Sequence, residues 1–486
     1  MQNDISVVMV SNRGPVSFVE KDGSFEMARG AGGLSGALDP VARRLGDQAV
    51  WIAAANSEDD RKALKAGAAD GLADELGYSL LLLDIEPEMY SQYYDVVSNR
   101  MLWFANHCLW DELNIKEFGE EELAAWESAY QPVNRQFADA ILEISDEDAL
   151  VLVQDYHLTM TPGYLRQKRP KATVSHFTHS SFCGPEGLER IPAPIPRSVI
   201  EGMLGADLLG FHVAPWVHGF LDCCERIGAK VDRASGTVEH AQRRTWVREY
   251  PIPIDAEELR ERAGGDMARR WGERFEGYTS GPLVVRADRA EPSKNIVRGF
   301  EAFGLVLDRR EDLRDKLRFV ACVYPSRQSM PEYRRYSEAI QSVVASVNER
   351  HAGSIELYME DDYDRTLGAL SVYDVLLVNP IMDGMNLVSK EGPTVNKRAG
   401  VLVLSQGAGS FEELGDLAVE IEDSLEVDAT ADAIEAALRM SPEEREKRSR
   451  ALCERASGRK PEHWIEAQLD DLKAIQAGRA PKTPPC

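Results

Sequence analysis

Residues 375–391 read VLLVNPIMDGMNLVSKE, and a second glycine-containing turn follows at 407–410 with the sequence GAGS. The apolar run 375–378 predicts a buried parallel strand, and the residues after Asp383 predict a turn that leads into a helix. The first N–H groups of a helix and its positive dipole end bind anions such as phosphates. Asp383 and Glu391 add two carboxylates, which accept hydrogen bonds from sugar hydroxyls. The stretch therefore indicates a site for a nucleotide-activated sugar.

Similar apolar runs alternate with helix-like segments along the whole chain. They occupy residues 5–10, 50–53, 149–153, 172–177, 283–285, 317–321, 375–378 and 401–404. Between them lie helix-like segments such as 121–144, and a last one covers 463–477. This alternation predicts βαβ units and parallel sheets. We expect an α/β fold with two doubly wound, Rossmann-like domains facing a cleft, because such sheets bind ligands at the carboxyl ends of their strands.

The chain has 486 residues, which is more than one hydrophobic core usually organises. Prolines 251 and 253 break the alternation, so we place the domain boundary there. The expected domains are 1–250 and 251–460. Residues 461–486 are expected to form a helix, free to cross back to the first domain, and a disordered tail from Arg479 onward.

Composition narrows the possible partners and compartment. The net charge of −25 disfavours binding to nucleic acid and to anionic membranes. Seven cysteines without a CxxC pair fit a reducing, cytoplasmic setting. The N-terminus does not resemble a signal peptide, and no apolar run is long enough to span a bilayer. We therefore expect small-molecule substrates rather than nucleic acid or membrane.

Charged residues follow the strand predicted at 283–285. Arg289 and Lys294 are five positions apart in this loop. An arginine provides bidentate hydrogen bonds and a lysine a point charge, so the two can converge on a diphosphate. The alternative is an ordinary solvated loop, which is common after a strand.

Asp155 and His179 also follow predicted strands, at the edge where open α/β sheets place their sites. Asp155 could equally cap a helix, and His179 could be a histidine packed beneath a loop. A metal site is not expected, because His176 and His179 lack a matched set of further ligands. The aromatic segment 93–103 is typical of a core or of a wall that stacks against sugars.

Together these motifs resemble the trehalose-6-phosphate synthase family, the retaining GT-B glycosyltransferases of family 20. The resemblance extends from about Val7 to the end of the last helix. It is carried by residues 11–13, 32–34, 94, 98–99, 103, 155–158, 179, 289, 293–294, 383–388 and 390–391.

The resemblance implies transfer of glucose from GDP-glucose or UDP-glucose to glucose 6-phosphate, without a cofactor or a metal. It implies that the first domain binds the acceptor and the second the nucleotide sugar. The implied donor-binding residues are Gly33, Asp383, Gly384, Met385, Asn386, Leu387, Val388 and Glu391. The implied catalytic residues are Asp155, His179, Arg289 and Lys294. The implied acceptor-binding residues are Arg13, Trp51, Tyr94, Trp103 and Arg327. Family members often form dimers or tetramers, so a homo-oligomer is expected.

The chain departs from the family pattern in three segments. Residues 179–183 read HSSFC where many members have HIPFP, and residues 289–294 read RAEPSK where many have RLDYSK. Residues 251–255 carry prolines where glycine is usual. We expect residues 180–183 to line the cleft, which leaves open another phosphorylated acceptor, such as glycerol 3-phosphate or an aminocyclitol phosphate. A third hypothesis is a catalytically silent regulatory homologue, which the complete donor set disfavours.

The same resemblance gives a weaker indication of which nucleotide base the donor carries. Residues 11–18 and 29–33 resemble a branch of the family that includes users of GDP-glucose.

Overall fold

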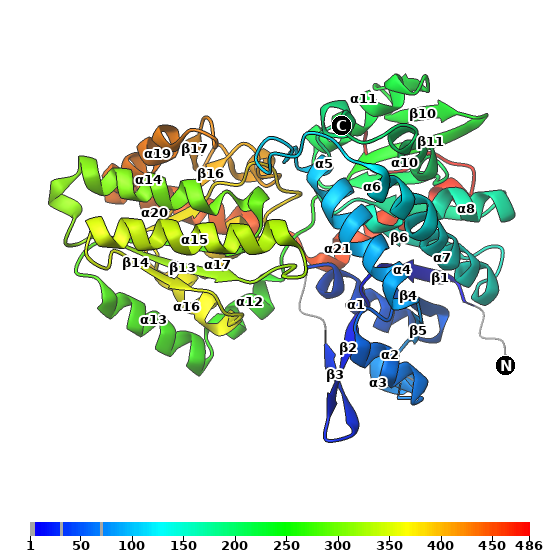
Figure 1. Cartoon of the computed structure of the whole chain (residues 1–486), viewed down its shortest axis with the longest axis horizontal. Coiled ribbons are helices and arrows are strands. Elements are labelled where there is room, and N and C mark those ends of the chain that lie inside the picture. Colours follow the sequence, from blue (N-terminus) through cyan, green and yellow to red (C-terminus); the bar gives the residue numbers. More distant parts are fainter. Residues whose placement is uncertain (1–4, 30–32, 69–70) are drawn as a thin grey trace. The chain divides into compact units, whose positions relative to one another are not determined.

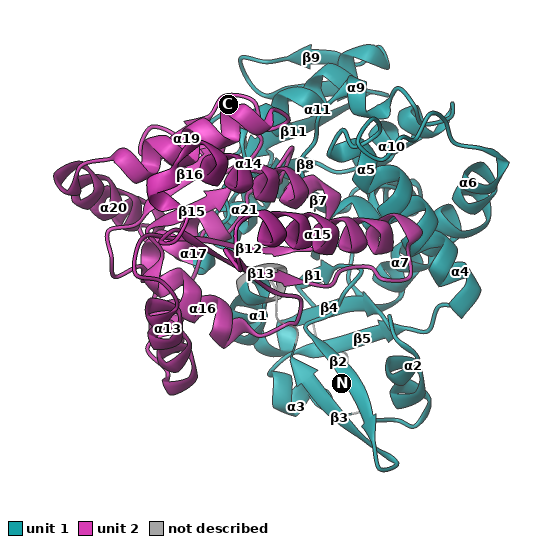
Figure 2. Ribbon diagram, turned by 60° about the vertical axis from the view of Figure 1, so that its left-hand side comes forward, with its two compact units in different colours: residues 1–252, 461–486 teal, residues 253–460 magenta. Residues whose placement is uncertain are grey.

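The computed structural model describes residues 5–29, 33–68 and 71–486, which fall into two compact units (Figures 1 and 2). Unit 1 comprises Met1–Ile252 together with Pro461–Cys486, and unit 2 comprises Pro253–Lys460. Each unit contains a largely or wholly parallel sheet, so the predicted α/β class is confirmed. None of the helices in the described part of the chain has the length and apolar character needed to cross a membrane.

The sheet of unit 1 has the strand order β5-β4-β1-β6-β7-β8-β11-β10-β9 within the described residues. Neighbours from β5 to β11 are parallel, whereas β10 and β9 are antiparallel. β1, β4 and β6 are buried along their whole length, as expected for parallel strands with both faces covered. The strands are β1 Val7–Val10, β4 Ala49–Ala54, β5 Ser79–Leu83, β6 Leu150–Gln154, β7 Thr173–Phe177, β8 Leu208–Phe211, β9 Lys230–Asp232, β10 Thr237–His240 and β11 Arg243–Glu249, with a separate hairpin of β2 Val16–Lys21 and β3 Ser24–Arg29.

The helices of unit 1 include one, α21, that follows unit 2 in the sequence. They are α1 Gly33–Leu45, η1 Gly46–Gln48, α2 Glu58–Lys65, α3 Leu72–Leu76, α4 Pro87–Ser91, η2 Gln92–Trp103, α5 Phe104–Asn106, α6 Glu120–Ala125, η3 Trp126–Tyr130, α7 Gln131–Ile144, η4 Tyr156–Leu158, α8 Thr161–Lys168, α9 Pro185–Leu188, α10 Ile195–Met203, α11 Ala214–Arg226 and α21 Pro461–Gln476. α21, red in Figure 1, packs against α1, β6 and β7. The last helix of the chain therefore completes the core of unit 1.

One expectation for unit 1 is confirmed with a local change, and one is corrected. The helix-like segment predicted over 121–144 is helical throughout, as α6, the π-helical η3 and α7 in direct succession. Pro132 lies near the start of α7, where its missing N–H group is tolerated. The tail expected to be disordered is held in place: Asp471 accepts the N–H of Lys482, and the Thr483 carbonyl accepts a hydrogen bond from Arg248 at 2.8 Å.

The sheet of unit 2 is parallel throughout its described residues, with the order β14-β13-β12-β15-β16-β17. The strands are β12 Leu283–Arg289, β13 Arg318–Tyr324, β14 Ile355–Tyr358, β15 Val375–Val378, β16 Val401–Ser405 and β17 Val419–Ile421. The helices are α12 Ala256–Ala263, α13 Asp266–Tyr278, η5 Pro292–Lys294, α14 Ile296–Arg309, η6 Glu311–Leu313, α15 Pro331–Arg350, α16 Tyr363–Val372, α17 Val388–Val395, α18 Phe411–Leu414, α19 Val427–Arg439 and α20 Pro442–Ala456.

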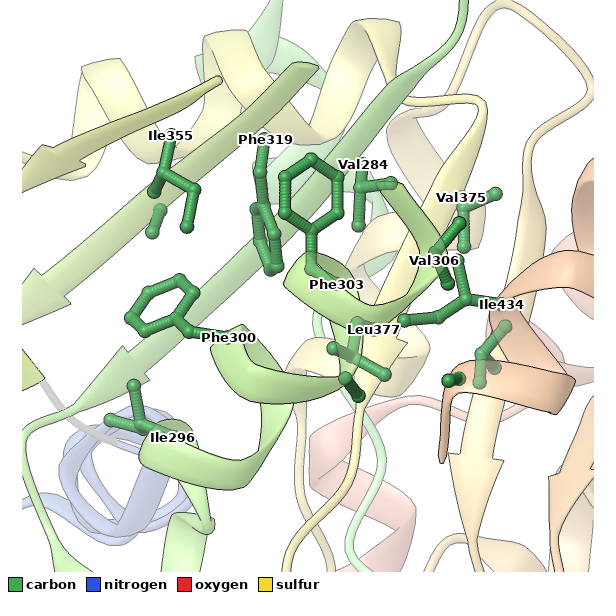
Figure 3. Close-up of a cluster of buried hydrophobic side chains, with 14 of the residues drawn as sticks. Val284, Ile296, Phe300, Phe303, Val306, Phe319, Ile355, Val375, Leu377 and Ile434 are labelled. Atoms are coloured by element: carbon green, nitrogen blue, oxygen red, sulfur yellow. The ribbon is translucent and has the colours of Figure 1, made fainter. Parts of the chain in front are cut away.

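The core of unit 2 has two layers, because side chains alternate along each strand. Val375 and Leu377 of β15 join one cluster with α14, α15 and α19, while Leu376 and Val378 join the other with α13 and α16. In the first cluster, Phe300 of α14 packs edge-on against Phe319 at 5.2 Å between ring centroids (Figure 3). Burying each such side chain contributes about 1.5–3 kcal/mol. Both faces of the sheet are thus covered, which leaves the strand ends to form a site.

Candidate functional site

Two loops at the carboxyl edge of the unit 2 sheet are joined backbone to backbone, one after β15 and one after β16. The N–H of Asp383 donates to the Gly407 carbonyl at 2.8 Å, and the N–H of Gly409 donates to the Asp383 carbonyl at 3.1 Å. A Cβ at Gly407 would overlap the Ile381 carbonyl. A Cβ at Gly409 would overlap the Gly384 carbonyl. The GAGS turn therefore needs its glycines because the two backbones approach so closely.

Asn386 shapes the turn before α17. Its φ of 67° is a left-handed conformation that asparagine tolerates better than most residues. The side-chain amide donates to Asp383 Oδ2 at 2.9 Å, and Oδ1 accepts the Ser389 N–H at 3.2 Å. Gly384, Met385 and Asn386 are buried, whereas Leu387 and Val388 are partly exposed. The side chains of Met385 and Asn386 thus support the turn, and their predicted contact with a donor would come from the backbone.

Lys294 and Asp383 form an ion pair beneath this turn. Lys294 ends η5, directly after β12, and its Nζ lies 2.5 Å from Asp383 Oδ2 with the two side chains 12% and 14% exposed. Burial alone would lower the pKa of Lys294, but Asp383 and Asp288 outweigh it and raise the pKa. The ammonium therefore stays charged. Arg286 donates to Asp288 at 2.8 Å and to the Lys294 carbonyl at 3.0 Å, which fixes the segment.

Arg289 and Arg327 share one buried carboxylate. The Nε of Arg289 lies 3.3 Å from Glu291 Oε1, and Nη1 of Arg327, in the loop after β13, lies 3.1 Å from the same oxygen. Burial alone would raise the pKa of Glu291, but the two arginines and Lys294 outweigh it and lower the pKa to about 2. Unit 2 thus gathers Arg289, Lys294 and Arg327 around Glu291 and Asp383. Arg327 was predicted as part of the acceptor set, whose other members belong to unit 1.

Glu391 lies on α17, partly buried, and no hydrogen-bond donor or cation in the described residues contacts its carboxylate. Burial raises its pKa to about 7, whereas an unfolded glutamate titrates at about 4.3. Between these values the folded protein keeps a proton that the unfolded chain has lost. Stability therefore falls as the pH rises through this window, and the loss is complete above about pH 7.

We expect the substitution Glu391→Gln, which removes this titration, to stabilise the protein more at about pH 8 than at about pH 5. Denaturant unfolding of both proteins at several pH values measures the difference, with Glu412→Gln, at an exposed position, as the control. A difference that stays constant from about pH 5 to about pH 8 would contradict the assignment.

Neighbouring strands bring three predicted residues to one edge of the unit 1 sheet. Arg13, Asp155 and His179 follow β1, β6 and β7, which are adjacent in the sheet. Arg13 Nη2 donates to the Tyr94 hydroxyl at 3.0 Å. Tyr94 in turn stacks against His157, with 5.6 Å between ring centroids. The carboxyl edge of a parallel sheet is where such folds bind ligands.

Asp155 has a strained backbone, with φ 73° and ψ 167°. This region is essentially limited to glycine and costs on the order of 1–3 kcal/mol. The strained geometry is held by the Asp155 N–H, which donates to the Phe177 carbonyl at 2.6 Å. Asp155 Oδ1 accepts the N–H of His179 at 3.1 Å. Its side chain makes no capping hydrogen bond to η4, so the helix-cap alternative does not describe its role.

His179 is a neutral, packed imidazole. Burial and two neighbouring histidines lower its pKa well below the usual range. Its Nε2 lies 2.9 Å from Gln154 Oε1, and its ring packs against Phe177 and Trp464 at 4.6 and 5.8 Å between centroids. A neutral imidazole offers a hydrogen bond to a ligand rather than a charge.

The two predicted acceptor tryptophans are largely inaccessible. Trp51, in β4, has no exposed surface, and its Nε1 donates to Ser11 Oγ at 2.8 Å. Ser11 Oγ donates to the Arg13 carbonyl at 2.6 Å. In this structure Trp51 supports the Arg13 loop, and its contact with an acceptor stays a prediction. Trp103 is 8% exposed and packs against Tyr156 at 5.4 Å between centroids.

The unusual segment at 180–183 does not present its side chains as predicted. Ser180, Ser181 and Phe182 are buried. Asn106 donates to Ser180 Oγ at 3.0 Å, and Ser181 Oγ donates to the Asn106 carbonyl at 2.8 Å. The expectation that the segment lines a cleft is therefore wrong for these three side chains, which face the interior of unit 1.

Other predicted and unpredicted residues complete the site. Gly33 is the first residue of α1, and the glycines just before it lie outside the described residues. In residues 5–29, 33–68 and 71–486, no group of three His, Cys, Asp or Glu side chains is arranged to hold a metal ion.

Glu291, Gln154 and Trp464 were not predicted. The first two adjoin predicted motifs, which is the only signal they carry, and Trp464 is distant in sequence.

Comparison with known proteins identifies the family. The family model described as glycosyltransferase family 20 matches residues 5–474. A trehalose-6-phosphate synthase of Mycobacterium sp. (strain KMS) is 33% identical over 496 residues, covering 98% of this chain and 97% of that protein. A validamine 7-phosphate valienyltransferase of Streptomyces hygroscopicus subsp. jinggangensis (strain 5008) is 31% identical over 441 residues, covering 88% and 86%.

The fold has a close counterpart among solved structures. An alpha,alpha-trehalose-phosphate synthase (UDP-forming) from Burkholderia vietnamiensis matches with a TM-score of 0.82 and 26% identity, covering 97% of this chain and 98% of that one. The resemblance inferred from the sequence motifs and the expected GT-B class are confirmed. This chain therefore belongs to glycosyltransferase family 20 and is a glycosyltransferase with the GT-B fold.

Proposed function

We propose that this protein transfers glucose from a nucleoside-diphosphate glucose to glucose 6-phosphate, giving trehalose 6-phosphate with retention at the anomeric carbon. The observation that carries the proposal is the buried Lys294–Asp383 pair beside Arg289, at the carboxyl edge of the unit 2 sheet. The names of curated relatives at about one-third identity support the choice of donor and acceptor.

On the donor side, we assign the leaving diphosphate to Arg289, Lys294 and the backbone N–H groups around Met385 to Val388. A departing diphosphate gains negative charge, and fixed cations and N–H donors stabilise that charge where it develops. Lys294 is held by its ion pair, and Arg289 carries the planar fork suited to phosphate. Asp383 and Glu391 would accept hydrogen bonds from the donor glucose and the ribose. These groups supply the charge themselves, so we propose a reaction without metal or cofactor.

For the acceptor, we assign binding of the sugar to Arg13 and Tyr94 within unit 1, and we assign a phosphate contact to Arg327 within unit 2. Asp155 would lie near the attacking hydroxyl, and neutral His179 would donate or accept one hydrogen bond with the donor sugar. Asp155 already accepts the His179 N–H, so one contact orients both residues.

We propose a same-face attack as the route to retention. The alternative, a double displacement, needs a free carboxylate nucleophile. Asp383 is neutralised by Lys294, and Asp155 is engaged with His179, which weakens either as a nucleophile. In the same-face route, the departing phosphate oxygen accepts the proton of the attacking hydroxyl, while the anomeric carbon passes through an oxocarbenium-like state.

The protein is expected to form a disaccharide phosphate from glucose 6-phosphate and at least one of ADP-, GDP- and UDP-glucose, with EDTA present. Mass spectrometry detects the product, and nuclear magnetic resonance of the anomeric protons reports retention. Reactions without acceptor are the control for donor hydrolysis. Absence of product with every donor would overturn the proposal, and activity lost in EDTA but restored by a divalent cation would overturn its metal independence.

A second candidate is transfer to another phosphorylated acceptor, such as an aminocyclitol phosphate or glycerol 3-phosphate. The valienyltransferase relative favours it. The burial of residues 180–182 weakens the argument from that segment. The same assay with those acceptors separates the two, because the preferred acceptor gives the higher kcat/KM.

A further inference from the structure

We propose that Glu291 is a positioning residue that fixes the side-chain orientations of Arg289 and Arg327. The donor diphosphate and the acceptor phosphate are then bound by one connected group of side chains. The inference rests on the proposed function for the assignment of one arginine to each phosphate.

A single oxygen of Glu291 makes all the contacts that carry the argument. Oε1 accepts from Ser326 Oγ at 2.9 Å and from Arg327 Nη1 at 3.1 Å, and Arg289 Nε lies 3.3 Å away. The Glu291 side chain has no exposed surface. Its other oxygen, Oε2, is buried and has no hydrogen-bond partner in the described part of the chain. A buried carboxylate of this kind is tolerated because cations surround it.

The two arginines differ in how firmly the rest of the fold holds them. The Arg327 side chain is 9% exposed, donates to the Tyr333 hydroxyl at 2.6 Å and lies over the Tyr333 ring at 5.3 Å from the centroid. Arg289 is 49% exposed. Its closest approach to Glu291 is through Nε, whereas the terminal nitrogens form the fork that binds phosphate. Glu291 thus orients Arg289 without using the atoms needed for a ligand.

Positioning and simple electrostatics predict effects of opposite sign. Glu291→Gln keeps the shape of the side chain and removes one negative charge from the neighbourhood of three cations. If Glu291 acted only through its charge, this change would strengthen phosphate binding and lower both KM values. If it positions the arginines, the change loosens both and raises both KM values, because the ion pair with Arg289 is lost and the charge-assisted hydrogen bond from Arg327 is replaced by a weaker one.

We expect Glu291→Gln to raise the KM of the nucleotide sugar and of the acceptor by about tenfold each. Glu291→Asp keeps the negative charge on a side chain one methylene shorter, and should raise both KM values less than Glu291→Gln does. In a double-mutant cycle, Glu291→Gln should have no further effect on the donor KM once Arg289→Ala is present. In that background Glu291→Gln should still raise the acceptor KM. In the Arg327→Ala background, Glu291→Gln should raise the donor KM and leave the acceptor KM unchanged.

A matched control lies at the opposite edge of the same sheet. Asp374, just before β15, is a buried carboxylate 3.0 Å from Arg445 and 3.3 Å from Arg398. Asp374→Asn should lower the unfolding midpoint, as loss of a buried ion pair does, and leave both KM values unchanged. This comparison separates a structural role from a positioning role.

The outcomes distinguish this inference from the proposed function. KM values that stay unchanged or fall in Glu291→Gln, or effects that add in the double variants, would overturn the positioning role while an active wild type leaves the function intact. If the wild type has no turnover, calorimetric titration with GDP, UDP and glucose 6-phosphate gives the same comparison for wild type and Glu291→Gln. Lack of binding of all three to the wild type would overturn both proposals.

Discussion

Lys294→Ala is expected to lower kcat by about 10²- to 10³-fold, the loss seen when one fixed donor to a developing charge is removed. The substitution removes the buried ammonium and also takes from the Asp383 carboxylate the positive charge of Lys294. In the proposed complex, that carboxylate would then repel the diphosphate of the donor. Initial rates of nucleoside-diphosphate release measure the effect. Lys397→Ala, at an exposed position of unit 2, is the matched control and should keep the wild-type rate.

The double change Lys294→Ala with Asp383→Ala tests the reason for this loss. Breaking a buried ion pair by removing one partner costs about 3–5 kcal/mol, whereas removing both is less damaging. We expect the double variant to recover part of the stability that Lys294→Ala loses, while kcat stays low. Recovery of kcat in the double variant would mean that Lys294 serves only to neutralise Asp383.

Gly409→Ala is expected to cost on the order of 3 kcal/mol of stability and to abolish measurable nucleotide binding. The added methyl group would overlap the Gly384 carbonyl, so the two loops would have to separate. Separation would break the hydrogen bonds between Asp383 and the GAGS turn, and with them the orientation of Asp383. Denaturant unfolding and calorimetric titration with GDP and UDP measure the two effects.

Gly277→Ala is the matched control for this substitution. Gly277 lies within α13, and a Cβ there meets nothing within 4 Å. Alanine is favoured over glycine inside a helix, so this variant should gain about 0.5–1 kcal/mol and bind nucleotide as the wild type does. Wild-type nucleotide affinity in Gly409→Ala would show that the joined loops are not needed for the donor.

The strands that carry the site were predictable because they are buried on both faces. The runs that become β6, β15, β16 and the first three residues of β12 are continuous and apolar, which is the pattern of a parallel strand. Short or half-exposed strands carried no such signal, so β9, β10, β14 and β17 were not predicted. The π-helical η2 and η3 escaped prediction for a related reason, since their residues fit a helical period.

Site residues were predictable where their position near the end of a strand determined their place. They were not predictable where contacts between distant parts of the chain determined it. Arg289 is the last residue of β12, Lys294 lies five positions beyond it, and the structure brings Lys294 to Asp383. The burial of Trp51 depends on the neighbouring strands and on Tyr78, which no local pattern reveals. The shared carboxylate of Glu291 depends on Arg327, from the loop after the next strand along the chain.

The return of α21 to unit 1 has a consequence for how the protein folds during synthesis. Trp464 Nε1 donates to the Tyr250 carbonyl at 2.8 Å, and the Tyr250 hydroxyl donates to Asp471 at 2.8 Å. Unit 2 is contiguous in sequence, so it can fold while the ribosome is still translating the final helix. Unit 1 begins first but must wait for residues more than two hundred positions later, and contacts of such separation form slowly. A chain that stalls before Pro461 would therefore expose an incomplete unit 1 to proteases and chaperones, although unit 2 would already be whole.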